Sequence, residues 1–145
     1  MRRHNSIINL SRDHHQGLIL AQLIRKNAPQ YKNLPDTLEG KINYTLNAYK
    51  ADLLPHFKKE EEILFPFVKG MNEKLDELIK QLIEEHKKIT DLVIRIEKED
   101  NKEEILDKLG NLLAQHIRKE ERELFEIVQD ILTEEELEKL DDLFN

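Results

Sequence analysis

The sequence contains no cysteine and no tryptophan, and its 145 residues include only four glycines and four prolines. The absence of cysteine excludes disulfides, thiolate metal sites and a cysteine nucleophile. No apolar run approaches the roughly 20 residues of a membrane span, and the first residues lack the apolar stretch of a secretory signal. A net charge of -7 without a basic stripe argues against nucleic acid as a partner. We therefore expect a cytoplasmic protein that binds neither nucleic acid nor a membrane.

Apolar residues recur at helical spacing almost throughout the chain, whereas strand-like alternation is missing. Together with 37% charged residues and few aromatics, this pattern predicts amphipathic helices. We predict an all-α, up-down-up-down four-helix bundle with a short C-terminal fifth helix, forming a single domain over residues 1–145. The bundle core is expected at about residues 6–131, in helices that span residues 6–27, 36–68, 72–98 and 101–131, followed by 133–144.

Four features of these helices can be predicted in more detail. Asp36 is expected to cap the second helix, and Gly70 to end it. Pro55 and Pro66 fall inside this helix and are expected to distort it, because proline removes one backbone hydrogen bond. The distortion at Pro55 either lets the helix wrap around the core or aims the next residue, His56. The predicted buried stripes of the first, second and fourth helices include Leu18, Ala21, Ile63, Phe67, Ile127 and Ile131.

Two segments sixty residues apart repeat the pattern His-x-x-x-Glu followed by Leu-Phe. They are HFKKEEEILF, which begins at His56, and HIRKEERELF, which begins at His116. Residues i and i+4 of a helix stand one turn apart on the same face. The pairs His56–Glu60 and His116–Glu120 can therefore each direct an imidazole nitrogen and a carboxylate oxygen toward one point.

His14 and His86 lie on the apolar stripes of the first and third helices, at the same level of the bundle. The chain runs 14 residues from His56 to the turn at Gly70 and 16 residues from there to His86. It runs 15 residues from His86 to Asn101 and 15 more to His116. At about 1.5 Å per residue these mismatches amount to a few ångströms. Four histidines and two glutamates are thus predicted to converge on one layer of the interior.

This polar layer predicts a metal site. Buried carboxylates are costly unless they are paired or bound to a metal, and the stripes carry no lysine or arginine to neutralise them. Imidazole and carboxylate without sulfur suit iron, and less decisively manganese or zinc. Six protein ligands are too many for one ion that also binds a substrate, whereas two carboxylates can bridge two ions and leave two histidines for each.

The segments SRDHHQGL, HFKKEEEILFP, EEHKKI and HIRKEERELF, in this order over about residues 6–130, resemble the hemerythrin-like (HHE cation-binding) domain family. The resemblance implies a di-iron centre with an oxo or hydroxo bridge, in which two glutamates bridge the ions and four histidines are terminal ligands. The metal ligands predicted in this way are His14, His56, Glu60, His86, His116 and Glu120.

The chain departs from oxygen-carrying hemerythrins at two positions. Four residues after His86, where those proteins have a second histidine, stands Thr90. They also have an aspartate five residues after the last histidine, whereas this chain has Glu120 four residues and Glu121 five residues after His116. One imidazole fewer leaves more open coordination. This fits redox chemistry, gas sensing or iron handling better than reversible oxygen storage.

The expected function is that of a non-haem di-iron protein that binds or reacts with O₂, NO or peroxide. Turnover would require an electron donor, whereas a stable adduct would mark a sensor or carrier. Two alternatives stay open: a non-catalytic iron-binding or iron-handling module, and a structural bundle whose polar layer fixes the helix register. Apolar walls around the site are expected to limit water and to select small ligands; they are Leu53, Phe57, Leu82 and Leu113.

Several neighbouring residues have alternative interpretations. His15 is the alternative ligand to His14, which is favoured because Leu10 lies one turn before it on an apolar stripe. Tyr49 is either a core residue or a residue whose hydroxyl reaches a metal-bound oxygen species or holds a ligand histidine. Glu61 and Glu121 are expected to be solvated or to orient lysines on the helix surface.

Overall fold

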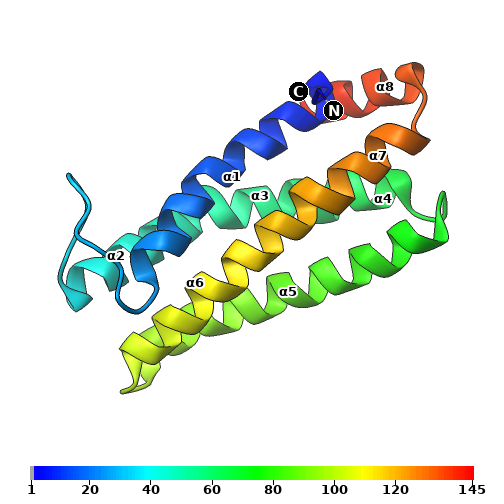
Figure 1. Ribbon diagram of the computed structural model, residues 1–145. Coiled ribbons are helices and arrows are strands. Elements are labelled where there is room, and N and C mark those ends of the chain that lie inside the picture. Colours follow the sequence, from blue (N-terminus) through cyan, green and yellow to red (C-terminus); the bar gives the residue numbers. More distant parts are fainter. Residues whose placement is uncertain (1) are drawn as a thin grey trace.

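The structure, a computed structural model, describes residues 2–145, and all regular structure in that range is helical. Two arms of the bundle are single helices, α1 (Asn5–Ile24) and α5 (Glu73–Lys98). The second and fourth arms are each divided by π-helical turns, and α8 (Glu134–Phe144) follows the fourth. Figure 1 shows the four arms side by side, with α8 and the two chain ends together at one end of the bundle. The predicted four-helix bundle with a short C-terminal helix is confirmed.

The second and fourth arms each contain a π turn at the glutamate of their His-x-x-x-Glu motif, and the second arm contains one more. The second arm consists of α2 (Leu38–Ala48), the π turn η1 (Tyr49–Leu53), α3 (Leu54–Lys59), the π turn η2 (Glu60–Leu64) and α4 (Phe65–Val68). The fourth arm consists of α6 (Lys102–Lys119), the π turn η3 (Glu120–Leu124) and α7 (Phe125–Ile131). The turns η2 and η3 start at the glutamates of the two His-x-x-x-Glu motifs.

The π turns explain both prolines and an error in the predicted stripes. Pro55 and Pro66 each lie in the first turn of the α-helical segment that follows a π turn, where the proline is tolerated. A π turn also holds about one residue more than an α turn, so it shifts the buried face by one position. The buried apolar residues are therefore Leu64, Phe65 and Val68 in η2 and α4, and Leu124, Phe125 and Val128 in η3 and α7. The predicted Ile63, Phe67, Ile127 and Ile131 are half-buried.

Local signals fix most helix ends. The side chain of Asn72 accepts a hydrogen bond from the backbone of Leu75 and caps α5, and Thr133 forms a capping box with Glu136 at α8. The cap of α2 is Thr37, so the prediction of Asp36 was wrong by one residue. Gly70 ends the second arm as predicted, because its φ of 81° is a conformation that glycine adopts without strain.

Two apolar clusters form the core on either side of the histidine layer. One contains Leu20, Ile24, Phe57, Ile89 and Leu113, and the other contains Ile7, Leu10, Leu64, Leu82 and Phe125. The predicted stripe residue Leu18 is instead 37% exposed, because the buried face of α1 contains Gly17 and Ala21 and not Leu18. At Gly110 a Cβ atom would lie 2.8 Å from the carbonyl oxygen of Ala21, so glycine allows α6 to approach α1 closely.

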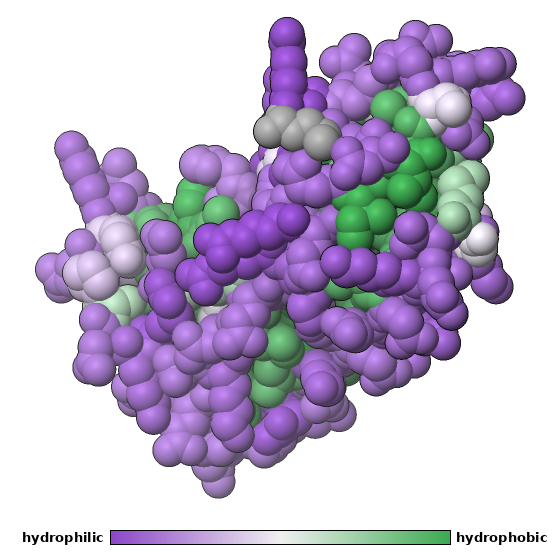
Figure 2. Space-filling view, turned by 45° about the vertical axis from the view of Figure 1, so that its right-hand side comes forward, coloured by the Kyte–Doolittle hydropathy of each residue, from purple (hydrophilic) through white to green (hydrophobic). Residues whose placement is uncertain are grey.

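The surface is largely polar. Figure 2 shows hydrophilic side chains over most of one face, as 37% charged residues imply, with apolar side chains reaching that face in a few places. Among residues 2–145, no helix has the length and apolar character needed to cross a bilayer.

Candidate metal centre

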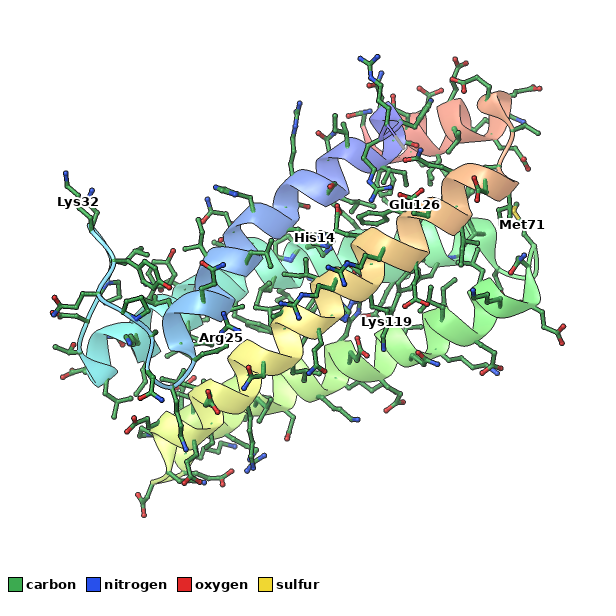
Figure 3. The ribbon with its side chains drawn as sticks, viewed as in Figure 1. His14, Arg25, Lys32, Met71, Lys119 and Glu126 are labelled. Atoms are coloured by element: carbon green, nitrogen blue, oxygen red, sulfur yellow. The ribbon has the colours of Figure 1, made fainter. Side chains whose placement is uncertain are left out.

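The six residues predicted as metal ligands meet in one buried layer. His14, His56, His86, His116, Glu60 and Glu120 come from all four arms of the bundle, and each is at most 4% exposed. His14 is labelled in Figure 3, where it lies about midway along the bundle between α1 and its neighbours. Short turns join the second arm to α5 and α5 to the fourth arm, so residues at matching distances from these turns lie at the same height.

The two His-x-x-x-Glu motifs converge as helical geometry requires. Nε2 of His56 lies 3.5 Å from Oε2 of Glu60, and Nε2 of His116 lies 3.4 Å from Oε2 of Glu120. The other arms complete the layer, since Nε2 of His86 lies 3.1 Å from Oε1 of Glu60. All four arms therefore direct imidazole nitrogens toward two buried carboxylates.

Glu120 is the centre of this arrangement. Its Oε1 lies 2.6 Å from Nε2 of His14 and 3.4 Å from Nε2 of His56, while Oε2 faces His116. Its carboxylate belongs to both groups of donor atoms that could hold a cation, the four residues Glu60, His86, His116 and Glu120 and the three residues His14, His56 and Glu120. A carboxylate shared by two such groups can bridge two ions.

Six buried nitrogen and oxygen atoms of the layer have no hydrogen-bond partner within residues 2–145. One is Nδ1 of His14, and the other five are both oxygens of Glu60, Oε2 of Glu120, and Nε2 of His86 and His116. Buried polar atoms are normally paired, and each unpaired one costs about 1–3 kcal/mol, more where the group is charged. The five atoms on Glu60, Glu120, His86 and His116 face one another in a compact group, so a cation bound among them would satisfy them together. The donor set fits a metal.

The structure separates the alternatives that the sequence left open. His14 enters the buried layer, whereas the neighbouring His15 is exposed. The hydroxyl of Tyr49 lies 2.8 Å from that of Thr90, with which it shares a hydrogen bond. Thr90 stands one helical turn after His86, so this pair lies beside the layer.

Glu61 is exposed, as expected, but it also accepts a hydrogen bond from His86. Glu121 is half-buried and contacts His14, and neither acid pairs with a lysine within residues 2–145. Two further carboxylates, Asp13 and Glu85, contact histidines of the layer and were not predicted. The sequence offered one indication of these contacts, since each of the four acids directly precedes or follows a predicted ligand.

Two spaces adjoin the layer. A small cavity of about 10 Å³ lies on the inner side, with room for about one water-sized molecule; among its lining residues are His14, His56, His116, Leu53, Phe57 and Leu113. An open groove of about 420 Å³ lies on the outer side, where His86 and Phe57 form part of the wall. Phe57 lines both spaces. The expected wall residues Leu53, Phe57, Leu82 and Leu113 are all buried.

The pKa values of the histidines and of Glu120 are shifted by the charges of the groups around them. Burial lowers the pKa of His116, but the charge of Glu120, whose Oε2 lies 3.4 Å from Nε2, and the hydrogen bond to Glu85 outweigh this effect and raise the pKa to about 10. Burial likewise opposes, but does not prevent, a raised pKa at His14 and His56, where neighbouring carboxylates favour the protonated ring. Burial raises the pKa of Glu120, yet the charge of His116 holds it well below its usual range. Protons on His14, His56 and His116 therefore balance the charge of Glu120 at neutral pH when no metal is bound.

These shifts predict how the stability of the metal-free protein depends on pH. A histidine with a raised pKa contributes stability that is complete below about pH 6.5 and is lost as the pH rises through its folded pKa. The free energy of unfolding should therefore fall between pH 6.5 and 9, by about 1.4 kcal/mol per pH unit for each histidine that stays protonated. Below about pH 4.5, stability should fall again because the lowered pKa of Glu120 requires its charged form.

Urea unfolding in the presence of a chelator, measured at pH 5.5, 7.5 and 9, tests this expectation. The variant His15→Gln should keep the same dependence, because His15 is exposed. A free energy of unfolding that stays constant from pH 6.5 to 9 would contradict the proposed charge balance.

Comparison with known families agrees with this geometry. The family model described as the hemerythrin HHE cation-binding domain matches residues 5–128, which include all six residues of the layer. Searches of curated proteins and of solved structures each found no match. A family match over most of the chain and a buried group of histidines and glutamates that could hold a cation lead to one conclusion. This chain belongs to the hemerythrin HHE cation-binding domain family.

Proposed function

We propose that this protein is a non-haem di-iron protein that binds or reacts with O₂, NO or peroxide. The observation that carries the proposal is the compact group of buried, unpaired donor atoms on Glu60, Glu120, His86 and His116. The ligands we propose for the two ions are His14, His56, Glu60, His86, His116 and Glu120. Two donor groups that share Glu120 support two neighbouring cations.

Iron is the metal that this donor set favours. Imidazole and carboxylate ligands without sulfur suit iron, with manganese and zinc as the other outcomes of a metal analysis. When bound, a pair of iron ions would supply one-electron redox chemistry and a coordination position for a small ligand.

The protein itself would restrict access to this position. Leu53, Phe57 and Leu113 wall the small cavity beside three of the histidines, whose volume of about 10 Å³ admits a molecule about the size of water. O₂, NO and peroxide fall near this size, whereas larger oxidants do not. An apolar wall also strengthens electrostatic interactions inside it, because it excludes water.

The residue at position 90 supports reactivity or sensing over oxygen storage. Thr90 stands where oxygen-carrying hemerythrins have a further histidine, and its hydroxyl is engaged by Tyr49 at 2.8 Å. The layer therefore offers four imidazoles. This leaves room for a small ligand to coordinate, which suits gas sensing or stress-related redox chemistry.

Iron handling without catalysis is a second candidate, favoured by the groove of about 420 Å³ whose wall includes His86. A groove that reaches a ligand would let iron enter and leave. Rapid loss of iron to a chelator, without any reaction with NO or peroxide, would support this function.

The test of the proposed function is the metal content of protein purified without oxygen, followed by an absorption spectrum on admission of air. About two irons per chain, with new absorption bands in air, would support the proposal. The absence of bound iron after anaerobic reconstitution with Fe²⁺ would overturn it. If iron binds, reaction of the reduced protein with NO or peroxide in the presence of an electron donor would mark an enzyme, and a stable adduct a sensor.

A further inference from the structure

The outer nitrogen of every histidine in the layer faces a carboxylate from a neighbouring arm. We name Asp13, Glu61, Glu85 and Glu121 the outer carboxylates. Nδ1 of His56 lies 3.0 Å from Asp13, Nδ1 of His86 lies 2.7 Å from Glu61, Nδ1 of His116 lies 2.7 Å from Glu85, and Nδ1 of His14 lies 3.5 Å from Glu121. Three of these contacts are hydrogen bonds, and the fourth, between His14 and Glu121, is longer and is not a hydrogen bond.

The four contacts form a closed cycle around the bundle. Asp13 on α1 reaches the second arm, and Glu61 on the second arm reaches α5. Glu85 on α5 then reaches the fourth arm, and Glu121 on the fourth arm returns to α1. Each arm thus gives one carboxylate and receives one, so the orientation of every histidine depends on the arm beside it.

The hydrogen bonds at Nδ1 select one form of the imidazole in His56, His86 and His116. A neutral imidazole carries one N–H, and an Nδ1–H that donates to a carboxylate leaves the lone pair on Nε2. Nε2 is the atom that faces Glu60 or Glu120 in all four histidines. Partners of this kind, on the far side of metal-bound histidines, orient the ring and increase its basicity.

We propose that the outer carboxylates are positioning residues that hold the four histidines with Nε2 directed toward a cation. This inference rests on the proposed function, because it assigns the outer carboxylates a role toward the metal that the layer would bind. Metal binding would then depend on the contacts between all four arms as well as on the six ligands.

The outer carboxylates are held unequally. Lys59 lies 3.5 Å from Asp13, and Lys119, labelled in Figure 3, lies 2.5 Å from Glu85. The hydroxyl of Ser11 donates its one hydrogen to the carboxylate of Glu121. Glu61 has no other hydrogen bond or ion pair within residues 2–145, and its side chain is 42% exposed at the groove.

The contribution of each outer carboxylate to metal binding should increase with how firmly it is held. Glu85 is 15% exposed and fixed by Lys119, so its hydrogen bond with His116 is shielded from water. The bond from His86 to Glu61 is open to solvent and to competing water. Loss of Glu85 should therefore weaken metal binding more than loss of Glu61.

The experiment measures the Fe²⁺ affinity of the full chain by competition with a chelator under anaerobic conditions. The variant Glu85→Ala should bind Fe²⁺ about 10- to 100-fold more weakly than the wild type. Glu85→Gln should recover part of this loss, because its amide oxygen can still accept from His116. Glu61→Ala should lose less than Glu85→Ala. The matched control is Glu84→Ala, which removes the same charge from an exposed neighbouring position on α5.

A second measurement reads the tautomer directly. In Zn²⁺-loaded protein, nitrogen-15 NMR should show an N–H on Nδ1 of the histidines, and the His116 signal should lose its protection from exchange in Glu85→Ala. A Glu85→Ala variant that binds Fe²⁺ as tightly as Glu84→Ala, with an unchanged His116 signal, would overturn the positioning role while the proposed function stands. A wild-type chain that binds neither metal would overturn both.

Discussion

The variant Glu120→Gln is expected to lose metal binding almost completely. Oxygens of Glu120 lie 2.6 Å from Nε2 of His14 and 3.4 Å from Nε2 of His56 and of His116. The carboxylate also belongs to both groups of donors that could hold a cation. Glutamine keeps the shape of the side chain but removes its charge and one acceptor oxygen. The affinity for Fe²⁺ should therefore fall by more than the roughly 10- to 100-fold expected for an outer partner.

The same variant should also be less stable without metal. Protonated histidines balance the charge of Glu120 in the metal-free protein, as the raised pKa of His116 and the lowered pKa of Glu120 indicate. Removing one member of a buried pair leaves the other uncompensated, which typically costs about 3–5 kcal/mol. Urea unfolding with a chelator present at pH 7 measures this loss.

A matched control and a distinct outcome make the test decisive. Glu123→Gln removes the same charge three residues later, where the side chain is exposed, and should change neither metal content nor stability. If the layer only fixes helix register, replacing both Glu60 and Glu120 by leucine should leave the bundle folded and as stable or more stable. That result, together with wild-type protein that takes up no iron, would favour a structural bundle.

The layer of six residues could be predicted because two simple rules determine it. The i, i+4 spacing fixes the relative positions of His56 and Glu60, and of His116 and Glu120. The near-equal distances of the histidines from the turns then fix the level at which the arms meet. Neither rule depends on the detailed packing of side chains, so the errors in the predicted stripes did not affect it.

The errors in the stripes arise from the π turns. A sequence pattern assumes a constant helical period, and nothing in HFKKEEEILF marks the turn that begins at Glu60. Each π turn moves the buried face by one residue, so Leu64 and Val68 are buried in place of Ile63 and Phe67. The prolines were a visible sign, since Pro55 and Pro66 each follow such a turn, but the third π turn at Glu120 has no proline after it.

The outer carboxylates were missed for a different reason. Asp13, Glu61, Glu85 and Glu121 each adjoin a residue of the layer, so on a helix diagram they lie about 100° from the buried stripe and are expected in solvent. Their partners belong to neighbouring arms, and contacts of this kind depend on how the helices pack. For Glu61 and Glu121 the sequence held one indication, because both motifs have a second glutamate directly after His-x-x-x-Glu.

The variant Phe57→Ala is expected to open the site to the solvent. The ring of Phe57 lies flat against that of His86, with centroids 3.9 Å apart, and meets His116 edge-on at 5.9 Å. It also lines both the small inner cavity and the groove of about 420 Å³ on the outer side. Its removal should join these two spaces, so that water and chelators reach the histidines through the groove.

Two measurements follow from this position. Truncation of a buried phenylalanine to alanine should lower the free energy of unfolding by about 3–5 kcal/mol. In the folded, metal-loaded protein, a chelator should remove the metal faster from Phe57→Ala than from the wild type. Leu54→Ala is the matched control, because Leu54 lines the groove but not the inner cavity, and this change widens the groove without joining the spaces. Equal rates of metal loss from the two variants would show that Phe57 packs the core without closing the site, whereas a faster loss specific to Phe57→Ala assigns it the role of the barrier.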